Sequence, residues 1–532
     1  MTRRPDRETW LFAALIVLHL LPVWLLPFAP TQDGPAHLSM AHALRQDGTS
    51  EGNYLREYFV PNEEAVPNRF IFFLLADVLR FLSLPVAEKV LLSAYVVLLP
   101  LSARYALRSV RPQAGFLAFL SFPFTYNFLL NMGFYNFCFS LPAFLFSLGF
   151  WLRQRGRLGI ARTAGLALLI LWTYFCHPVT LGVLVGTLLT LASWRTLLAL
   201  RRRQGLRSLR WLAGPLMASA PAVVLLLSFF QDRMGGPVSD MTLAAKARQL
   251  AALYSLVSLD TRLVAFSLAL STVLGLLALT ALGHRSRRRH LLRADGLLLA
   301  TLLLTVIYFV APNEMGQGGF VTHRLNLFPF LVLILWLGTF SFPEALRVSI
   351  RSAGAAISFG FLGAMFAIWA GLGAYLSDIL TAAPHVEPRR TLLTLSFSNA
   401  GVEEDGSGDL TFRTWPFVHA GSHIAARVSV VDLALYEAHE DYFPLTYRPE
   451  RDPFVHLVRE PLELEAEPPR VDLPGYRART GGRIDYVLLV WPEALPPDDP
   501  RARELRRQLA ATYERIHTSP EGLAELWRWR WP

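Results

Sequence analysis

The residues best suited to chemistry near the N-terminus lie in the polar segment 31–37 (TQDGPAH), directly after an apolar run from Trp10 to Ala29. Gly-Pro breaks the helix there, and an amphipathic stretch follows from Ala36 to Arg45. A carboxylate held by a tight turn at a membrane interface is placed to act as a base on substrates that arrive from water. The alternative is that Asp33 caps the helix led by Pro35, and for this segment taken alone the capping role is favoured.

Three further polar clusters are expected on the same face of the molecule. Ionisable groups at membrane depth are costly, which makes such clusters candidates for function. Each cluster also has a purely structural explanation. In that explanation His177 caps a helix end, the asparagines are polar groups within the packing, and the side chain of Arg324 extends to the membrane interface. The clusters are Asn127, Asn131, Tyr135 and Asn136 in one turn, His177-Pro178 in another, and the loop 312–324 with Glu314, His323 and Arg324.

The elements that must position these groups are helices that cross a membrane. Of 532 residues, 53% are hydrophobic and only 17% are charged, whereas soluble domains carry about 25% charged residues. The apolar runs of about twenty residues are typical of membrane spans. Although the net charge is +10, the basic residues lie in short clusters between these runs. That pattern belongs to membrane insertion, so we expect no nucleic-acid partner.

Hydropathy and loop charge together predict a multi-pass membrane protein with about eleven spans. Nearly all its basic residues are Arg, which fits a GC-rich bacterial genome, so we expect the inner (cytoplasmic) membrane of a bacterium. The Arg-rich loops fall on one side, whereas the opposite loops around Asn131, around His177 and at 312–322 contain no Lys or Arg, which places the N-terminus in the cytoplasm and the C-terminus outside. The run Arg69–Leu82 is short and contains Asp77 and Arg80, so we expect it to lie in the outer interface. The predicted spans are 10–29, 88–107, 113–130, 134–152, 158–176, 178–198, 211–230, 262–283, 294–311, 324–342 and 353–376.

From about Ser377 onward, charges and prolines increase. The chain therefore divides into a transmembrane domain, 1–376, with an outer loop and interfacial helices at about 30–87, and a small extracytoplasmic α/β domain, 377–532. His419 and His423 stand four residues apart, but Gly421-Ser422 between them argues against a helix and a chelating pair. We expect strands at Thr391–Phe397, Ala426–Val431 and Ile484–Val490, followed by a helix at Arg501–Ile516.

Two stretches carry a resemblance to a known family. The segment from Asn68 to Ala76 (NRFIFFLLA), continuing through LSLPVAEK at 82–89, is similar to the interfacial helix, short loop and second span of GT-C glycosyltransferases. The segment RIDYVLL at 483–489 is similar to their outer domains. The layout as a whole resembles this superfamily, which includes the protein O-mannosyltransferase and aminoarabinose transferase lineages.

The resemblance implies transfer of a hexose or pentose from a polyprenyl-phosphate carrier to an acceptor outside the cytoplasm. Asp33 would be the general base, a role that typically contributes ~10²–10⁴ in rate, and Arg69 would contact the carrier phosphate. From charge and placement we add Arg324 and His323 to the phosphate site, because the arginine fork can bind two oxygens. We expect the substrate cavity to be lined by His37, Asn131, Asn136, His177 and Glu314.

No cofactor is expected, and a divalent metal is not favoured. Many relatives carry an acidic residue in the outer loop after the third span, where this chain has Asn131 and Asn136. Asp33 and His37 alone supply too few ligands for a metal. The expected partners are membrane lipid, a polyprenyl-phosphate-linked sugar and an acceptor that the sequence does not identify.

Two other classes of function remain. A lipid or glycan transporter or flippase would favour polar residues near the membrane midplane and internal repeats, whereas here the polar residues gather at one face and no repeat is visible. A non-catalytic membrane protein of polysaccharide assembly would keep the fold without needing Asp33. Substitution of Asp33 by asparagine separates that class from the enzyme.

Overall fold

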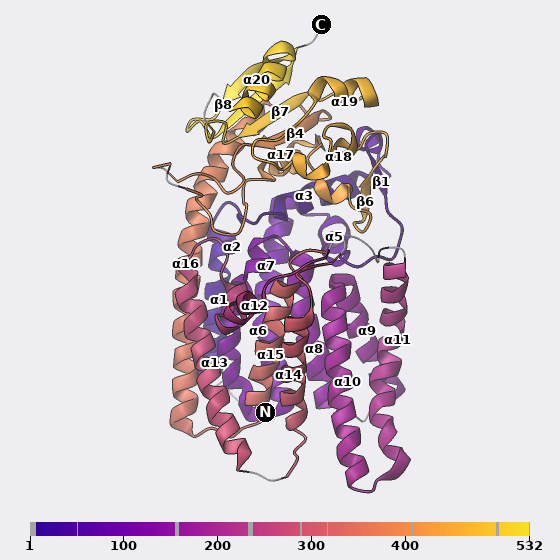
Figure 1. Ribbon diagram of the computed structural model, residues 1–532, viewed down its shortest axis with the longest axis vertical. Coiled ribbons are helices and arrows are strands. Elements are labelled where there is room, and N and C mark those ends of the chain that lie inside the picture. The colour runs from indigo at the N-terminus through magenta and orange to yellow at the C-terminus, as the bar shows by residue number, and fades with distance from the viewer. Residues whose placement is uncertain are drawn as a thin grey trace.

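The computed structural model describes residues 7–50, 52–154, 159–231, 233, 238–287, 290–315, 318–403, 405–406, 408–495 and 499–530. A bundle of long helices forms one end of an elongated molecule and a sheet-containing domain forms the other, with the two chain termini at opposite ends (Figure 1). Within the described residues, seven helices are long and apolar enough to cross a membrane, and three apolar helices are shorter. The chain is a polytopic α-helical membrane protein with a small C-terminal sheet domain.

The predicted spans all correspond to helical segments, but one of them is not an α-helix. Residues predicted as the span 113–130 form a 3₁₀-helix, η2 (Pro112–Tyr126), whose side chains from Ala114 onward are buried. A 3₁₀-helix rises about 2 Å per residue, so a short segment can still cover about 30 Å. The other segments are α1 (Arg7–His19) with α2 (Leu21–Leu25), α6 (Leu84–Val110), α8 (Tyr135–Arg153), α9 (Ile160–Cys176), α10 (Pro178–Arg201), α11 (Arg210–Gln231), α13 (Leu263–Ser286), α14 (Asp295–Val310), α15 (Val321–Leu337) and α16 (Glu344–Ile379).

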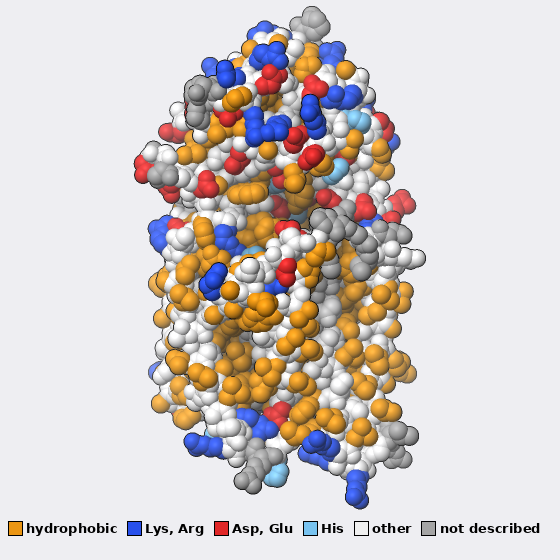
Figure 2. Space-filling view, viewed as in Figure 1, with side chains coloured by type: hydrophobic (Ala, Val, Ile, Leu, Met, Phe, Trp, Pro, Cys, Tyr) orange, Lys and Arg blue, Asp and Glu red, His pale blue; other side chains and the backbone are white. Residues whose placement is uncertain are grey.

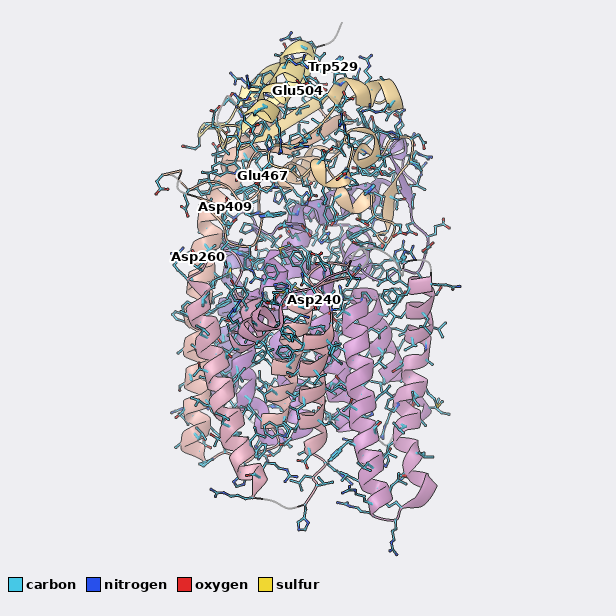
Figure 3. All side chains as sticks on the ribbon, in the orientation of Figure 1. Asp240, Asp260, Asp409, Glu467, Glu504 and Trp529 are labelled. Atoms are coloured by element: carbon cyan, nitrogen blue, oxygen red, sulfur yellow. The ribbon has the colours of Figure 1, made fainter. Side chains whose placement is uncertain are left out.

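Charge is distributed unequally along the long axis. On the face shown in Figure 2, apolar side chains cover the bundle, Lys and Arg side chains lie at its lower end, and both signs of charge lie over the C-terminal domain. Figure 3 labels Glu504 and Trp529 on the sheet domain, far from the bundle, and Asp240 near the junction. Basic residues at one end of an apolar bundle follow the pattern of cytoplasmic loops, and the predicted orientation rests on that pattern.

The polypeptide between α2 and α6 lies at the junction between the bundle and the C-terminal domain. The predicted interfacial run is divided into α5 (Phe70–Phe72) and a π-helix, η1 (Phe73–Val78). Arg45 donates to the carbonyl oxygens of Leu75, Leu79 and Leu82 at 2.6–3.0 Å, which caps the end of this segment. The remaining elements here are α3 (Gly34–Gln46), α4 (Asn53–Arg56) and β1 (Phe59–Pro61), which pairs with β6 of the C-terminal domain.

Short elements lie between the long helices elsewhere, and η5 leads from α16 to the C-terminal domain. They are α7 (Phe128–Asn131), η3 (Gly205–Leu209), β2 (Val238–Ser239), α12 (Leu243–Ala251), η4 (Tyr254–Leu256), β3 (Glu314–Met315) and η5 (Leu380–His385).

The C-terminal domain is built on a five-stranded sheet with the order β5-β4-β7-β9-β8. β4 runs parallel to both β5 and β7, and β9 is antiparallel to β7 and β8. Its elements are β4 (Thr391–Ser396), α17 (Ala420–Val428), β5 (Val431–Asp432), η6 (Tyr436–Ala438), β6 (Leu445–Tyr447), α18 (Pro453–His456), η7 (Pro461–Glu463), α19 (Leu473–Thr480), β7 (Tyr486–Val490), α20 (Pro500–Thr512), β8 (Tyr513–Thr518) and β9 (Ala524–Trp529).

Two local predictions in this domain are wrong. Half of the segment predicted as the strand Ala426–Val431 lies in α17, and only Val431 belongs to a strand, β5 (Val431–Asp432). The helix predicted to reach Ile516 ends at Thr512, where β8 follows. The argument that Gly421 prevents a helix also fails. A Cβ at Gly421 would collide with the side chain of Thr394 on β4, so the glycine lets the helix pack directly on the sheet. Tertiary contact here outweighs the low helix propensity of glycine.

Candidate active site

A cavity of about 340 Å³ lies where the bundle meets the C-terminal domain. Residues from distant parts of the sequence contribute to its wall, and most of them come from turns and helix starts at this end of the bundle. The lining residues used below are Asp33, His37, Asn68, Asn136, His177, Val179, Arg233, Arg324, His419, Tyr436, Tyr442 and Glu465.

Asp33 lies in a turn that is tied to the turn between α7 and α8. The amide of Gln32 donates to the Asn131 carbonyl at 2.9 Å, and the amide of Asp33 donates to the Met132 carbonyl at 3.2 Å. Asp33 directly precedes α3, yet its side chain makes no capping hydrogen bond. The capping role considered for Asp33 is therefore wrong, and its carboxylate faces the cavity instead.

Gly133 allows this close approach of the two turns. It has φ +82°, and a Cβ there would lie 2.6 Å from the backbone nitrogens of Asp33 and Gly34. We expect Gly133→Ala to lower the thermal unfolding temperature, because the left-handed conformation alone costs about 1–2 kcal/mol and the backbone collision adds to it. Gly275→Ala on α13, where a Cβ has open space, is the matched control and should leave the unfolding temperature unchanged or raised. Equal unfolding temperatures would contradict the prediction.

The carboxylate of Asp33 is buried against the C-terminal domain. The hydroxyl of Tyr436 donates to its Oδ2 at 3.0 Å, and Nε2 of His419 lies 3.8 Å from its Oδ1. Burial raises the pKa of Asp33 to about 7, and repulsion from Glu437 and Glu465 adds to the rise, whereas His37 and the Tyr436 hydroxyl oppose it. A carboxyl group with a pKa near neutrality suits general acid–base work.

His37 lies one helical turn after Asp33 and is held at both ring nitrogens. Its Nε2 lies 2.9 Å from the carbonyl oxygen of Gly133, and its Nδ1 contacts the carboxylate of Glu437. Burial alone lowers the pKa of His37, but attraction to Glu437 and Asp33 outweighs it, so the pKa lies above its ordinary value. The histidine predicted to line the cavity therefore does so as half of a buried pair with the C-terminal domain.

Arg324 lines the same cavity as Asp33. Its guanidinium donates to the Gly319 carbonyl and lies over the ring of Phe134, 4.6 Å from the centroid. Among the described residues it has no acidic partner within ion-pair distance. An arginine without a carboxylate partner in a cavity wall is suited to bind an anionic ligand.

Two residues predicted to bind phosphate lie elsewhere. His323 is outside the cavity lining and packs its ring on Phe128 and Phe320, with centroids 5.2 and 5.7 Å apart. Arg69 is also outside the lining, and its guanidinium donates to the carbonyl oxygens of Asn62 and Glu64. Neither placement supports the phosphate role predicted for it.

The residues predicted to line the substrate cavity divide into two groups. Asn136 and His177 line the cavity that contains Asp33 and Arg324. Asn136 donates to the Asn68 carbonyl at 2.6 Å, and His177 also accepts a helix-capping hydrogen bond from the Val179 amide at 3.3 Å. Asn131 is buried and bonds to Ser258 and Trp369, and Glu314 accepts from Ser239, so both lie outside the lining.

Sequence reasoning missed the contribution of the C-terminal domain to this site. Tyr436 and Asp33 are 403 positions apart in the chain. The segment 436–442 (YEAHEDY) is rich in acidic and aromatic residues, but nothing in that composition indicates contact with a loop near the N-terminus. Within the described residues, no group of three or more His, Cys, Asp or Glu side chains is arranged to hold a metal ion.

A second cavity, of about 210 Å³, lies between α10, α14 and the start of α15. It shares Val179 with the first cavity, and its wall also includes Leu325, the residue after Arg324. Gly182 and Gly186 open it further, since a Cβ at either position would meet no atom within 4 Å. The other lining residues are apolar or threonine: Val183, Thr187, Thr190, Ala300, Leu303, Leu304 and Ile307.

Comparisons with known proteins give likeness of structure alone. No family model matches the sequence, and no curated protein matches it. Among solved structures, the chain is similar to the crystal structure of ArnT from Cupriavidus metallidurans in the apo state. The likeness covers 97% of this chain and 97% of that chain, at 10% sequence identity and a TM-score of 0.47.

Proposed function

We propose that the chain is an integral membrane glycosyltransferase of the GT-C type. In this proposal it transfers a sugar from a polyprenyl-phosphate carrier to an acceptor at the extracytoplasmic face, with Asp33 as general base. The observation that carries the proposal is that Asp33 and Arg324 line one cavity, and that this cavity shares Val179 of its wall with an apolar cavity between α10 and α14.

The chemistry needs a base, an anion-binding group and a place for a lipid chain. The carboxylate of Asp33 takes the proton of an acceptor hydroxyl as that oxygen bonds to the anomeric carbon of the donor sugar. The bond between that carbon and the phosphate oxygen breaks, and the carrier leaves as polyprenyl phosphate. The guanidinium of Arg324 stabilises the negative charge that develops on the phosphate as this bond breaks.

The apolar cavity supplies the place for the lipid chain. Because Val179 belongs to both walls and Leu325 follows Arg324, a phosphate at Arg324 has apolar space directly beside it. Each CH₂ group buried there contributes about 0.8 kcal/mol. A carrier lipid thus has its charged end at Arg324 in the first cavity and its chain between the helices.

The test is binding of a polyprenyl phosphate to the full chain in nanodiscs. Gly182→Leu places a side chain in the apolar cavity and should weaken binding about tenfold, because it excludes roughly two CH₂ groups of the chain. Gly275→Leu on α13, where a Cβ also meets open space, is the matched control and should bind as the natural protein does. Failure of the natural protein to bind polyprenyl phosphate, or equal binding by Gly182→Leu, would reject this assignment.

A further inference from the structure

The surroundings of Asp33 come largely from the C-terminal domain. The hydroxyl of Tyr436 donates a hydrogen bond to Oδ2 of Asp33 at 3.0 Å, and the Tyr436 ring stacks on His419 with centroids 5.2 Å apart. His419 Nε2 is 3.8 Å from Oδ1, which is too long for a hydrogen bond. One oxygen of Asp33 is therefore fixed by a donor, and Oδ1 is the oxygen placed to accept a proton from a ligand.

The pair His37–Glu437 holds a proton next to this carboxylate. The Gly133 carbonyl only accepts hydrogen bonds, so His37 Nε2, which lies 2.9 Å from it, carries a hydrogen. His37 Nδ1 faces the carboxylate of Glu437, and both side chains are buried. Buried charges are tolerated when they are paired, so an ionised Glu437 makes His37 an imidazolium.

We propose that Glu437 is a positioning residue for the proposed base, keeping His37 in its charged form beside Asp33 while its neighbour Tyr436 fixes one carboxylate oxygen. The inference rests on the proposed role of Asp33. Two consecutive residues of the C-terminal domain thereby complete a site whose base belongs to the first loop of the membrane domain. That domain is in this view a part of the catalytic apparatus.

The direction in which the pKa of Asp33 changes on loss of the Glu437 charge follows from the charges around Asp33. The attraction of His37 lowers the pKa of Asp33 by more than the repulsion of Glu437 raises it, and Glu465 raises it without contacting His37. Without the charge of Glu437, burial favours neutral His37, and Asp33 loses its nearest positive charge. The other titratable groups facing this cluster are His419 at the start of α17, Tyr442, Arg324 on α15, Glu88 on α6 and Asp432 on β5.

The experiment follows the protonation of Asp33 itself. Infrared difference spectroscopy of the full chain in nanodiscs records the carbonyl band of protonated carboxyl groups as a function of pH, and the band absent from Asp33→Asn belongs to Asp33. In the natural protein its midpoint should lie near pH 7. In Glu437→Gln the midpoint should rise by about one pH unit. Glutamine removes the negative charge of Glu437 and can donate a hydrogen bond to the neutral ring of His37, so Asp33 loses its nearest positive charge.

Glu465→Gln is the matched control, since it also removes one negative charge from the same domain near Asp33. It should move the midpoint downward, because only a repulsion is lost. A downward or absent shift in Glu437→Gln would overturn the inference, since Glu437 would then act as a simple nearby charge or not at all. If Glu437→Gln does not fold, His37→Asn removes the same positive charge and should also move the midpoint upward.

This titration needs neither donor nor acceptor. An upward shift in a protein that binds no polyprenyl phosphate would reject the proposed function and leave the coupling of Glu437 to Asp33 intact. Donor binding and transfer with no upward shift would reject the coupling alone.

Discussion

Asp33→Asn is expected to reduce sugar transfer by ~10²–10⁴ while the protein still inserts and folds. Asparagine keeps the size of the side chain and can still accept from the Tyr436 hydroxyl, which lies 3.0 Å from Oδ2 in the natural protein. It cannot take a proton from an acceptor hydroxyl at neutral pH. The measurement is transfer from a polyprenyl-phosphate sugar in membranes that contain matched amounts of each protein.

The control for this substitution is the unfolding temperature, which shows whether the fold is retained. Since burial raises the pKa of Asp33, removing its ionisable carboxyl should not lower the unfolding temperature above pH 7. Full transfer activity in Asp33→Asn would exclude the base and favour the non-catalytic assembly protein considered from the sequence. Loss of transfer together with normal polyprenyl phosphate binding would support the enzyme.

The pH dependence of the natural protein follows from the same group. The pKa of Asp33 is raised to about 7, so the ionised fraction, and with it the transfer rate, should rise as pH increases from 6 to 8. A base is active in its ionised form, and its apparent pKa is seen as the acid limb of the rate profile. A rate already maximal at pH 5 would contradict this assignment.

Arg324→Gln is expected to weaken binding of polyprenyl phosphate roughly ten- to hundredfold. A charge-assisted hydrogen bond contributes about 1.5–3 kcal/mol, and glutamine replaces it with a neutral one. Arg324→Lys should recover part of the loss, because lysine restores the charge without the two-pronged geometry. The dissociation constant for the carrier phosphate, measured in nanodiscs, is the readout.

Arg233 provides the comparison for Arg324 within the same cavity. Its guanidinium already donates to Glu64 at 2.9 Å and Asp441 at 3.1 Å. Arg233→Gln should therefore change carrier binding by less than about fivefold, the effect of losing partly exposed ion pairs. A larger loss in Arg233→Gln than in Arg324→Gln would assign the phosphate site to Arg233 instead.

The membrane fold could be predicted largely from the sequence because its constraint is local. A chain that crosses a lipid bilayer must satisfy its backbone hydrogen bonds within each segment, so long apolar runs become helices. The hydrophobicity of residues 112–126 does not specify the type of helix, and this segment forms a 3₁₀-helix. In the C-terminal domain, where β4 and α17 pack through Gly421, local propensity predicted the wrong element.

Part of the site could also be predicted, because the position of polar groups next to apolar runs is a local feature of the sequence. Asp33 and Arg324 could be selected as polar groups beside apolar runs, and the structure places both in one cavity. His323 could not be separated from Arg324 by sequence, because adjacent residues on a helix point in directions about 100° apart and the orientation of α15 was unknown. Only packing decided that Arg324 faces the cavity and His323 faces Phe128.

The sequence by itself therefore determined a multi-spanning helical membrane protein, a C-terminal domain of different composition, and a set of polar residues at the helix ends. These follow from hydrophobicity and charge along a continuous segment. Only the tertiary structure decided that Tyr436 and Glu437 reach Asp33 and His37. Contacts between residues some 400 positions apart depend on how the two parts of the molecule dock, and no local pattern encodes that docking.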